Sequence, residues 1–365
     1  MPEIECDSAR TFVEDLRADE ASVVEAVVED GWPQKMAREG LARHFETWNV
    51  DRLAASLEAE LLAVERSRDL RLVRPQRIHH IWPALPGAGI TPVLVGMLLG
   101  IDQQIRPSRR GIHFARRVAD AAPWGLIEAD ERWDDADVIV VSGTDETVAE
   151  IRRRMGRRGR VVGYGHRVSL AVVVDGPDVD LEGVAGGIGD DVVMWHQQGC
   201  FSVRAVLFCG DDGRRREFCE LLADEIEVRE RRWDAEDIDD GELASRAQAI
   251  GVAELEGDVF CDGIGYVRPV DRAFDGRREA IHSVTVHDVD GPNEVDEIID
   301  LGPANLQGVA LGGAWKKRRT EWLEALGDVG ATRICGPGDL QRPPADWWHD
   351  GRPNGLSLLR VVTVG

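Results

Sequence analysis

The spacing of apolar residues divides the chain into a helical start and a long alternating region. Between Ser8 and about Arg68, apolar residues recur every three to four positions, which is the period of an amphipathic helix. They are Phe12, Leu16, Val23, Val24, Val27, Val28, Leu53, Leu57, Leu61 and Leu62. Gly31-Trp32-Pro33 interrupts the first helical segment. We expect residues 1–75 to form a helical region that packs on the domain that follows.

From Arg77 onward, short apolar runs alternate with helical segments. The predicted strands cover 77–82, 102–106 and 137–142, the predicted helices cover 90–99, 108–122 and 145–155, and another strand begins at residue 160. Such repetition predicts an α/β fold with a parallel, doubly wound sheet. Ligands of such sheets bind at the carboxyl ends of the strands, where the connecting loops lie.

A second set of predicted strands and helices runs from about 170 to 333. It begins with a β-branched strand at 170–174, a helix of small residues and a strand at 204–208. Later segments cover 215–226, 241–251, 259–260, 282–286, 294–300 and 317–327. We expect a first α/β domain over 76–170, a second over 171–338 with a cleft between the two, and a return segment over 339–365.

Composition limits the possible partners. The 365 residues carry a formal net charge of −23, which argues against a nucleic-acid partner because phosphate binding needs a basic surface. Lysine is almost absent, while arginine and aspartate are abundant. Such an acidic surface is typical of a halophile-like protein kept soluble in concentrated salt. A GC-rich genome is the alternative explanation.

Other sequence features indicate a cytoplasmic protein without a metal. No apolar run is long enough to span a membrane, and the first residues lack the basic start of a signal peptide. The six cysteines form no CxxC pair, so neither disulfides nor structural zinc is indicated. His79 and His80 are adjacent in a predicted strand and point to opposite faces, so we reject metal binding there.

The candidate nucleophile is Cys200. Gln197-Gln198-Gly199-Cys200 stands at the end of a predicted helix and just before a strand. Thiolates become reactive at such corners, through backbone dipoles and partial exposure. The remaining cysteines of the two domains are better interpreted as small hydrophobic side chains: Cys209, Cys219, Cys261 and Cys335.

A second candidate site is the turn Gly143-Thr144. It follows a predicted strand and precedes a predicted helix, where backbone N–H groups and a hydroxyl can bind a pyrophosphate. The same residues also fit an ordinary turn in which Thr144 caps the helix.

Three motifs stand around the candidate nucleophile: Gly165-His166-Arg167-x-Ser169, Asp190-Asp191-Val192 and Gln197-Gln198-Gly199-Cys200-Phe201-Ser202. In their order they resemble the aldehyde dehydrogenase superfamily, and most closely its acyl-CoA reductase branch, the LuxC-type fatty-acyl reductases. The resemblance extends upstream to Pro86-Gly87, Gly100, Arg106-Pro107-Ser108 and Ser142-Gly143-Thr144, and resumes near Thr332–Gly351. It implies an aldehyde-dehydrogenase-like fold, with a cofactor domain over 76–170 and a catalytic domain over 171–338.

The resemblance also implies a cofactor and its site. Arg106, Ser108, Gly143 and Thr144 match positions that bind the nicotinamide dinucleotide in this superfamily. Arg109 and Arg110 follow, and guanidinium groups suit a 2′-phosphate, which favours NADPH with NADH as the alternative.

The implied reaction is reduction of a fatty acyl-CoA, or an acyl-carrier thioester, to an aldehyde through a Cys200 acyl-enzyme. Gly163 stands where oxidising relatives have a glutamate, which suits thiol exchange, whereas Ala84 falls where they have an oxyanion-binding asparagine. The alternative is a catalytically impaired relative that binds a ligand or serves as a partner subunit. The resemblance further suggests a homo-oligomer and leaves room for an acyl-activating partner.

Overall fold

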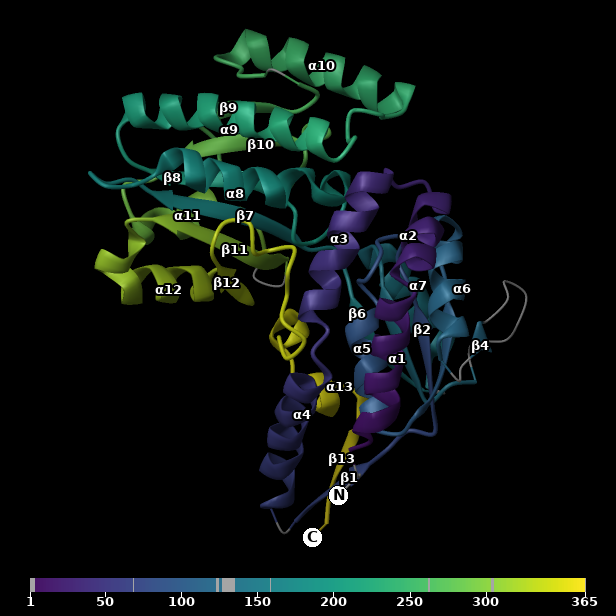
Figure 1. Ribbon diagram of the computed structural model, residues 1–365. Coiled ribbons are helices and arrows are strands. Elements are labelled where there is room, and N and C mark those ends of the chain that lie inside the picture. Colours follow the sequence, from purple (N-terminus) through teal and green to yellow (C-terminus); the bar gives the residue numbers. More distant parts are fainter. Residues whose placement is uncertain are drawn as a thin grey trace. The chain divides into compact units, whose positions relative to one another are not determined.

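The computed structural model describes residues 4–67, 69–122, 125–126, 135–157, 159–261, 263–302 and 305–364 (Figure 1). The chain forms two compact units, Met1–His166 with Pro344–Gly365, and Arg167–Pro343. The second unit begins before the expected residue 171 because the strand Val168–Val174 belongs wholly to its sheet. It ends after the expected residue 338 because the backbone N–H groups of Gly338 and Gln341 both bind the carboxylate of Asp191.

Four helices open the first unit, in the region predicted to be helical. They are α1 (Cys6–Ala18), α2 (Glu20–Glu29), α3 (Gln34–Thr47) and α4 (Val50–Glu65). Helices α1 and α4 contact α5 (Ile90–Leu98), and α2 contacts α6 (Ile112–Asp120). The Asp30 carboxylate accepts the N–H groups of His113 and Phe114, both at 3.0 Å, and so occupies the amino end of α6.

The sheet of the first unit is parallel and doubly wound, as predicted. Its strands are β2 (Arg77–Ile81), β3 (Asp102–Arg106), β4 (Gly125–Leu126), β5 (Val138–Ser142) and β6 (Arg160–Tyr164), in the order β4-β3-β2-β5-β6. The helices of this sheet are α5, a short 3₁₀ turn η1 (Arg109–Gly111), α6 and α7 (Asp145–Met155). The chain runs outward from β2 to β4 and then returns to β5 on the other side of β2. The switch point therefore lies at the carboxyl ends of β2 and β5.

The first sheet is covered on both faces. Val138, Ile139, Val140 and Val141 are all buried, which is typical of a central parallel strand. Helix α7 covers one face, where Ile151 and Met155 pack on alternate residues of β5. The adjacent histidines lie on opposite faces: His80 Nε2 is 2.7 Å from Gln103 Oε1, and His79 Nε2 is 3.7 Å from Asp135 Oδ1.

The C-terminal segment returns to the first unit. It forms a 3₁₀ turn η5 (His349–Gly351), α13 (Asn354–Leu358) and β13 (Arg360–Thr363), which pairs antiparallel with β1 (Leu70–Val73). The buried Glu60 carboxylate of α4 accepts the N–H groups of Asn354, Gly355 and Leu356 at 2.8–3.0 Å. Three otherwise unsatisfied donors at the start of α13 are therefore bound by one side chain.

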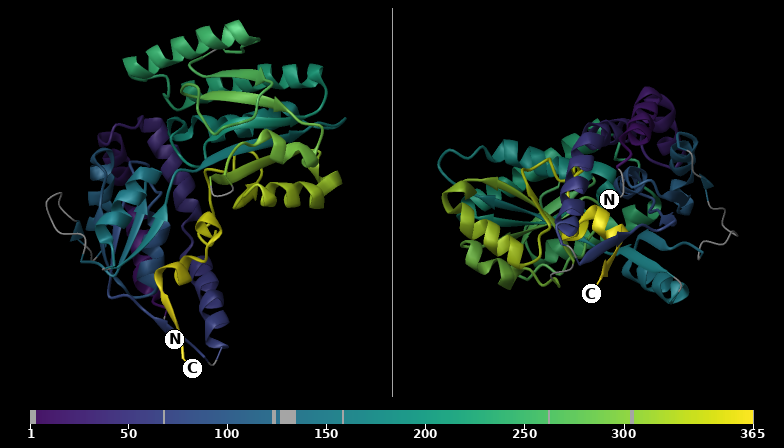
Figure 2. Two further views of the ribbon diagram at one scale, coloured as in Figure 1. Left: turned by 180° about the vertical axis from the view of Figure 1, so that it is seen from behind. Right: turned by 90° about the horizontal axis from the view of Figure 1, so that it is seen from below.

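The second unit is built on six parallel strands in the order β12-β11-β7-β8-β10-β9 (Figures 1 and 2). The strands are β7 (Val168–Val174), β8 (Val203–Cys209), β9 (Tyr266–Val270), β10 (Ser283–Asp288), β11 (Leu306–Gly313) and β12 (Arg333–Cys335). The helices are α8 (Leu181–Val193), α9 (Asp212–Arg232), α10 (Asp240–Glu256), α11 (Val295–Ile298) and α12 (Arg319–Asp328), with 3₁₀ turns η2 (Met194–Gln197), η3 (Pro292–Glu294) and η4 (Trp315–Arg318).

Alternate residues of the central strands form a core with the helices of one face. Leu170 and Val172 of β7 and Leu207 of β8 pack with Trp322 and Leu326 of α12. On the opposite face, Phe208 of β8 contacts Phe218 of α9, with ring centroids 5.4 Å apart. Both faces of β7 and β8 are therefore buried, as expected for a parallel sheet.

The second sheet differs from its sequence prediction at several strands. The strand predicted at 259–260 is only one bridge between Phe260 and Val267, and the strand itself follows as β9. Strand β11 was not predicted, although it lies next to β7. Its sequence, Leu-Gln-Gly-Val-Ala-Leu-Gly-Gly, contains three glycines and gives a weak strand signal. Among the described residues, no helix is both long and apolar enough to cross a membrane.

Candidate active site

Cys200 lies in the loop that connects η2 to β8, at the amino end of a central strand of the second sheet. Its side chain is partly exposed, as are those of Cys209 and Cys335, whereas Cys219 is buried. Burial raises the pKa of the Cys219 and Cys335 thiols to about 12. Those two thiols therefore stay protonated at neutral pH, in agreement with their interpretation as inert side chains.

The backbone just before Cys200 is strained. Trp195, His196 and Gln197 have φ values of 56°, 51° and 57°, which place three consecutive non-glycine residues in the left-handed region. Each such residue costs about 1–2 kcal/mol relative to a right-handed helix. Burial of Trp195 stabilises this backbone conformation. The Gln197 amide stabilises it further, because it donates to Val203 O at 2.7 Å and to Ser283 O at 2.9 Å.

A buried serine fixes the carbonyl group of Cys200. The Ser169 hydroxyl donates to Cys200 O at 2.7 Å and accepts the Gly308 N–H at 3.1 Å. Ser169 lies on β7 and Gly308 on β11, so one hydroxyl connects the Cys200 loop to two strands. The pairing register of β7 with β8 shifts between Ser169 and Leu170, next to this contact.

A second set of hydrogen bonds holds the other end of the loop. The buried Asp191 carboxylate of α8 accepts the Gly338 N–H at 2.7 Å. The Gln341 amide donates to Asp191 O at 3.4 Å and to Ser202 Oγ at 3.2 Å. Ser169 and Asp191 were noted in the sequence only as parts of motifs. Gln341 carried no sequence signal, because it comes from a segment 139 positions after Ser202.

Two arginines connect the residues around Cys200 to the 276–283 segment. Arg204 Nη1 donates to Gly276 O at 2.9 Å, and Arg278 Nη1 donates to His196 O at 3.2 Å. Arg278 also binds Glu242 at 3.0 Å. Burial lowers the pKa of Arg204, the nearby Arg278 lowers it further, and a charged Cys200 raises it.

His196 stacks on His282, with ring centroids 5.6 Å apart. Burial, with the neighbouring His282 and Arg278, lowers the pKa of His196 to about 4, so this histidine is neutral at pH 7. His282 is fully buried, and its Nδ1 lies 2.6 Å from the Glu230 carboxylate. The histidine pair therefore has a carboxylate on its far side and the Cys200 loop on its near side.

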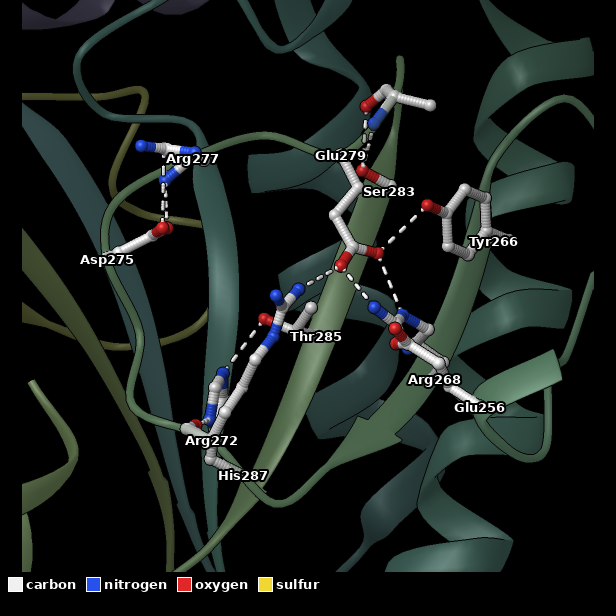
Figure 3. A network of polar contacts seen from close by, with 11 residues as sticks. Glu256, Tyr266, Arg268, Arg272, Asp275, Arg277, Glu279, Ser283, Thr285 and His287 are labelled. Atoms are coloured by element: carbon white, nitrogen blue, oxygen red, sulfur yellow. Dashed lines mark hydrogen bonds and ion pairs between the residues drawn. The ribbon is translucent and has the colours of Figure 1, made fainter. Parts of the chain in front are cut away.

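The 276–283 segment is anchored by the Glu279 carboxylate (Figure 3). Glu279 accepts hydrogen bonds from Tyr266 Oη at 2.9 Å and from Arg268 Nε at 2.8 Å, both on β9, and it also pairs with Arg272. Burial raises the pKa of Glu279, but the bonds and charges of these partners outweigh it, and the net pKa is lowered. The segment that carries Arg278 and accepts the hydrogen bond of Arg204 is therefore held to the sheet by an ionised side chain.

The predicted cofactor residues all lie in the first unit, at the carboxyl ends of its strands. Arg106 ends β3, and its carbonyl oxygen accepts the Trp82 N–H at 2.9 Å. Ser108 comes just before η1, and its buried Oγ has no hydrogen-bond partner among the described residues. Arg109 and Arg110 are exposed. These residues follow β3, which is next to the central strand β2.

Gly143 and Thr144 follow β5, on the other side of β2. Thr144 caps α7, because its hydroxyl accepts the Thr147 N–H at 3.3 Å. Asp145 and Glu146 fill the first turn of α7, and the Glu146 pKa is lowered first by its own N–H and then by the Thr144 hydroxyl. Negative charge thus already occupies this helix end, so phosphate contact here would depend on Gly143 and Thr144 and not on the helix dipole.

Residues 128–361 match a known protein family. The matching family is described as acyl-CoA reductase (LuxC). No curated protein matches the sequence.

The structure is similar to several solved aldehyde dehydrogenases. The NADP-dependent glyceraldehyde-3-phosphate dehydrogenase from Bacillus halodurans, solved with NADP, has a TM-score of 0.70 at 14% identity, covering 99% of this chain and 86% of the other. The NAD-dependent benzaldehyde dehydrogenase from Corynebacterium glutamicum has a TM-score of 0.66 at 16% identity, covering 98% and 84%. At this identity the likeness establishes the fold, and it confirms the predicted aldehyde-dehydrogenase-like architecture.

The Glu279 cluster predicts a specific pH dependence of stability. Because the folded-state pKa of Glu279 lies below its usual value of 4.5, its contribution is complete above pH 4.5 and is lost as pH falls through the folded-state pKa. Glu279→Gln should reduce the free energy of unfolding by about 2 kcal/mol at pH 7, and the difference from wild type should shrink towards pH 3. Urea unfolding at several pH values measures this, with the exposed Glu297→Gln as the control. A difference that stays constant with pH would contradict an ionic role for Glu279.

Proposed function

This chain belongs to the acyl-CoA reductase (LuxC) family, and we propose that it reduces a fatty acyl thioester to an aldehyde with NADPH, through an acyl-enzyme on Cys200. Family membership makes it an NAD(P)-dependent oxidoreductase. The proposal that Cys200 forms the acyl-enzyme rests on one observation. Cys200 is a partly exposed thiol in a loop fixed at both ends by hydrogen bonds from Ser169, Gln197 and Gln341.

In the first step, the Cys200 thiolate attacks the acyl carbonyl carbon. A bond forms between Sγ and that carbon, the carbon–sulfur bond to the carrier thiol breaks, and the carrier leaves as a thiolate that takes a proton from solvent. The backbone N–H of Cys200 is a suitable donor to the carbonyl oxygen as negative charge develops. A fixed loop helps here, because the donor and the nucleophile belong to the same residue and keep their mutual geometry.

The nicotinamide dinucleotide fits the carboxyl ends of the first sheet. The buried Ser108 hydroxyl, which makes no hydrogen bond within the described part of the chain, suits a ribose hydroxyl. Arg106 suits a neighbouring oxygen of the adenosine half. Gly143 lets the backbone after β5 approach a phosphate without a side chain in the way. When bound, this cofactor supplies the hydride that converts the thioester to an aldehyde and returns Cys200 to the thiolate.

Two substitutions relative to the superfamily bear on the outcome. Because Gly163 stands where a glutamate base would be, hydrolysis of the acyl-enzyme is disfavoured and hydride transfer to its acyl carbon is favoured. Ala84 removes an oxyanion donor, which typically costs roughly 100- to 1,000-fold in rate. This second substitution favours the alternative candidate, a catalytically impaired relative that binds an acyl or nucleotide ligand or acts as a partner subunit.

Acylation of Cys200 is the most direct test of the nucleophile. Incubation with a long-chain acyl-CoA without cofactor should add one acyl group, because the first step needs no hydride. Intact mass spectrometry should show this adduct in wild type and in Cys261→Ala, which removes the exposed cysteine, but not in Cys200→Ala. Equal acyl uptake by wild type and Cys200→Ala would rule out Cys200 as the nucleophile.

Cofactor preference tests the arginines after β3. Wild type should bind NADPH more tightly than NADH, because exposed guanidinium groups at residues 109 and 110 can pair with the 2′-phosphate. Arg109→Ala or Arg110→Ala should reduce the preference by about tenfold, which corresponds to one charge-assisted hydrogen bond. Fluorescence titration measures both affinities, with Arg153→Ala on α7 as the control for net charge. Equal affinity of wild type for both cofactors would remove the case for NADPH.

A further inference from the structure

Helix α10 is attached to the second unit by few apolar contacts. It lies on the outer side of that unit, beyond α9 (Figure 1). Of its residues Asp240–Glu256, all of which the structure describes, only Ala253 is buried. Polar contacts tie the inward side of the helix to the unit: Arg246 to Gly263 O at 2.8 Å, Glu242 to Arg278 at 3.0 Å and Glu256 to Arg268 at 2.8 Å. Helix α10 therefore lacks the apolar packing from which most helices in proteins gain their stability.

The apolar side chains of α10 lie on its exposed side. Leu255 is 88% exposed and Val252 is 50% exposed. Both belong to a stripe of uncharged, exposed residues that recur at intervals of three and four: Ala244, Ala247, Gln248, Gly251, Val252 and Leu255. The space beside Gly251 is open, since a Cβ atom there would meet nothing within 4 Å. Such spacing is that of the seam between two packed helices.

The residues in and around this α10 stripe favour a helix as its partner over a lipid surface. Helices that lie on membranes carry lysine or arginine beside the apolar face. The one cation of α10 is Arg246, which is bound to the unit, and the exposed Glu254 next to the stripe would be repelled by anionic lipids. Gly251 and the alanines, by contrast, allow the backbone of a second helix to come close, to about 8 Å between axes.

We propose that the α10 stripe binds the same stripe of a second copy of this chain, as an antiparallel pair related by a twofold axis. The distribution of side-chain sizes supports this partner. The large residues Val252 and Leu255 lie in the carboxyl-terminal half of the helix, and Ala244 and Ala247 lie in the other half. An antiparallel pair therefore sets large residues against small ones. The contact is separate from the chemistry proposed for Cys200.

One register of this pair satisfies every position of the stripe. When the twofold axis passes between positions 249 and 250, Leu255 packs against the partner's Ala244, and Val252 packs against the partner's Ala247. Gln248 then lies against the partner's Gly251. This is the alternation of seam positions found in antiparallel helix pairs, with each large side chain filling the space left by a small one.

Charge also favours the antiparallel arrangement. In the same register Glu254 stands opposite the partner's Ser245, so the carboxylates of α10 do not face one another. The amino end of each helix lies beside the carboxyl end of the other, which is the favourable orientation of the two helix dipoles. A parallel pair would instead set Leu255 against its own copy, leave a gap between the two Gly251 residues and bring like charges together.

The expected contact is small. A helix of 17 residues is about 25 Å long, so a pair of such helices belongs with the smallest specific interfaces. The dimer should therefore form at high protein concentration. Concentrated salt should strengthen it, because salt screens the repulsion between two chains that each carry a net charge of −23.

The test is the mass of the full-length protein by light scattering, over a range of protein concentrations in concentrated salt. Loss of this contact halves the assembled mass, whatever other contacts the chain makes. Leu255→Glu should raise the concentration needed for half-maximal assembly at least tenfold. Val228→Glu, which makes the same change at a 51% exposed position of α9, is the matched control and should leave assembly unchanged.

A swap of side chains tests the register. Leu255→Ala should weaken assembly, and the double variant Leu255→Ala with Ala244→Leu should restore it, because each pair again contains one large and one small residue. Gly251→Leu adds apolar surface but should weaken assembly, since the partner's Gln248 then has no space. These residues are exposed, so the substitutions leave the core of the unit intact.

Four results would overturn the proposal. They are a wild-type mass equal to that of Leu255→Glu at every concentration, a double variant no better than Leu255→Ala, and stronger assembly of Gly251→Leu, which would indicate unspecific apolar attraction. The fourth is binding of wild type to phosphatidylcholine vesicles, lost in Leu255→Glu, without self-association, which would assign the stripe to lipid. None of these results depends on acylation of Cys200, so the proposed function is tested separately.

Discussion

The chemistry proposed for this protein depends on the hydrogen bond between the Ser169 hydroxyl and the carbonyl oxygen of Cys200. The bond joins a loop to the middle of a parallel sheet, and the same hydroxyl is held by the backbone of β11. Three left-handed residues immediately upstream would relax to a lower-energy backbone if the loop were free. Burial and the two hydrogen bonds of the Gln197 amide oppose this relaxation. A cysteine held in this way presents its thiol and its backbone N–H in a fixed relation, which acyl transfer requires.

The first unit depends on a different constraint, the reversal of strand order at β2. Because β3 and β5 lie on either side of β2, the residues that follow them are brought to the same edge of the sheet. Arg106 and Ser108 follow one strand, and Gly143 and Thr144 follow the other. The acidic first turn of α7 and the Asp30 carboxylate at α6 show that both nearby helix ends are already neutralised by the protein. A dinucleotide here would be recognised chiefly by side chains and by close backbone approach.

Many of the helices and strands could be predicted from the sequence, and the elements that were missed have physical causes. Helical periodicity predicted a helical region where α1 to α4 lie. The strand ends at Arg106 and Ser142 were predicted to the residue, because turn residues, Pro107-Ser108 and Gly143-Thr144, follow them. Strand β11 was missed because glycine stands at positions where β-branched residues would mark a strand, although all its residues except Gly313 are buried. The supports of Cys200 were also missed, because Gln341 and Gly308 come from distant segments.

If the protein reduces an acyl thioester, it must produce an aldehyde. Aldehyde formation therefore tests the proposed reaction most directly. The purified protein is mixed with NADPH and a panel of acyl-CoAs of different chain length. Concentrated salt is used, because it screens the repulsion that a net charge of −23 produces. Aldehyde is measured by mass spectrometry and NADPH oxidation by absorbance, in wild type and in Ala84→Asn. We expect aldehyde equal in amount to the NADPH oxidised, and a faster reaction in Ala84→Asn if the missing oxyanion donor limits the rate. No aldehyde from either protein with any acyl-CoA would contradict the reductase and leave the ligand-binding alternative.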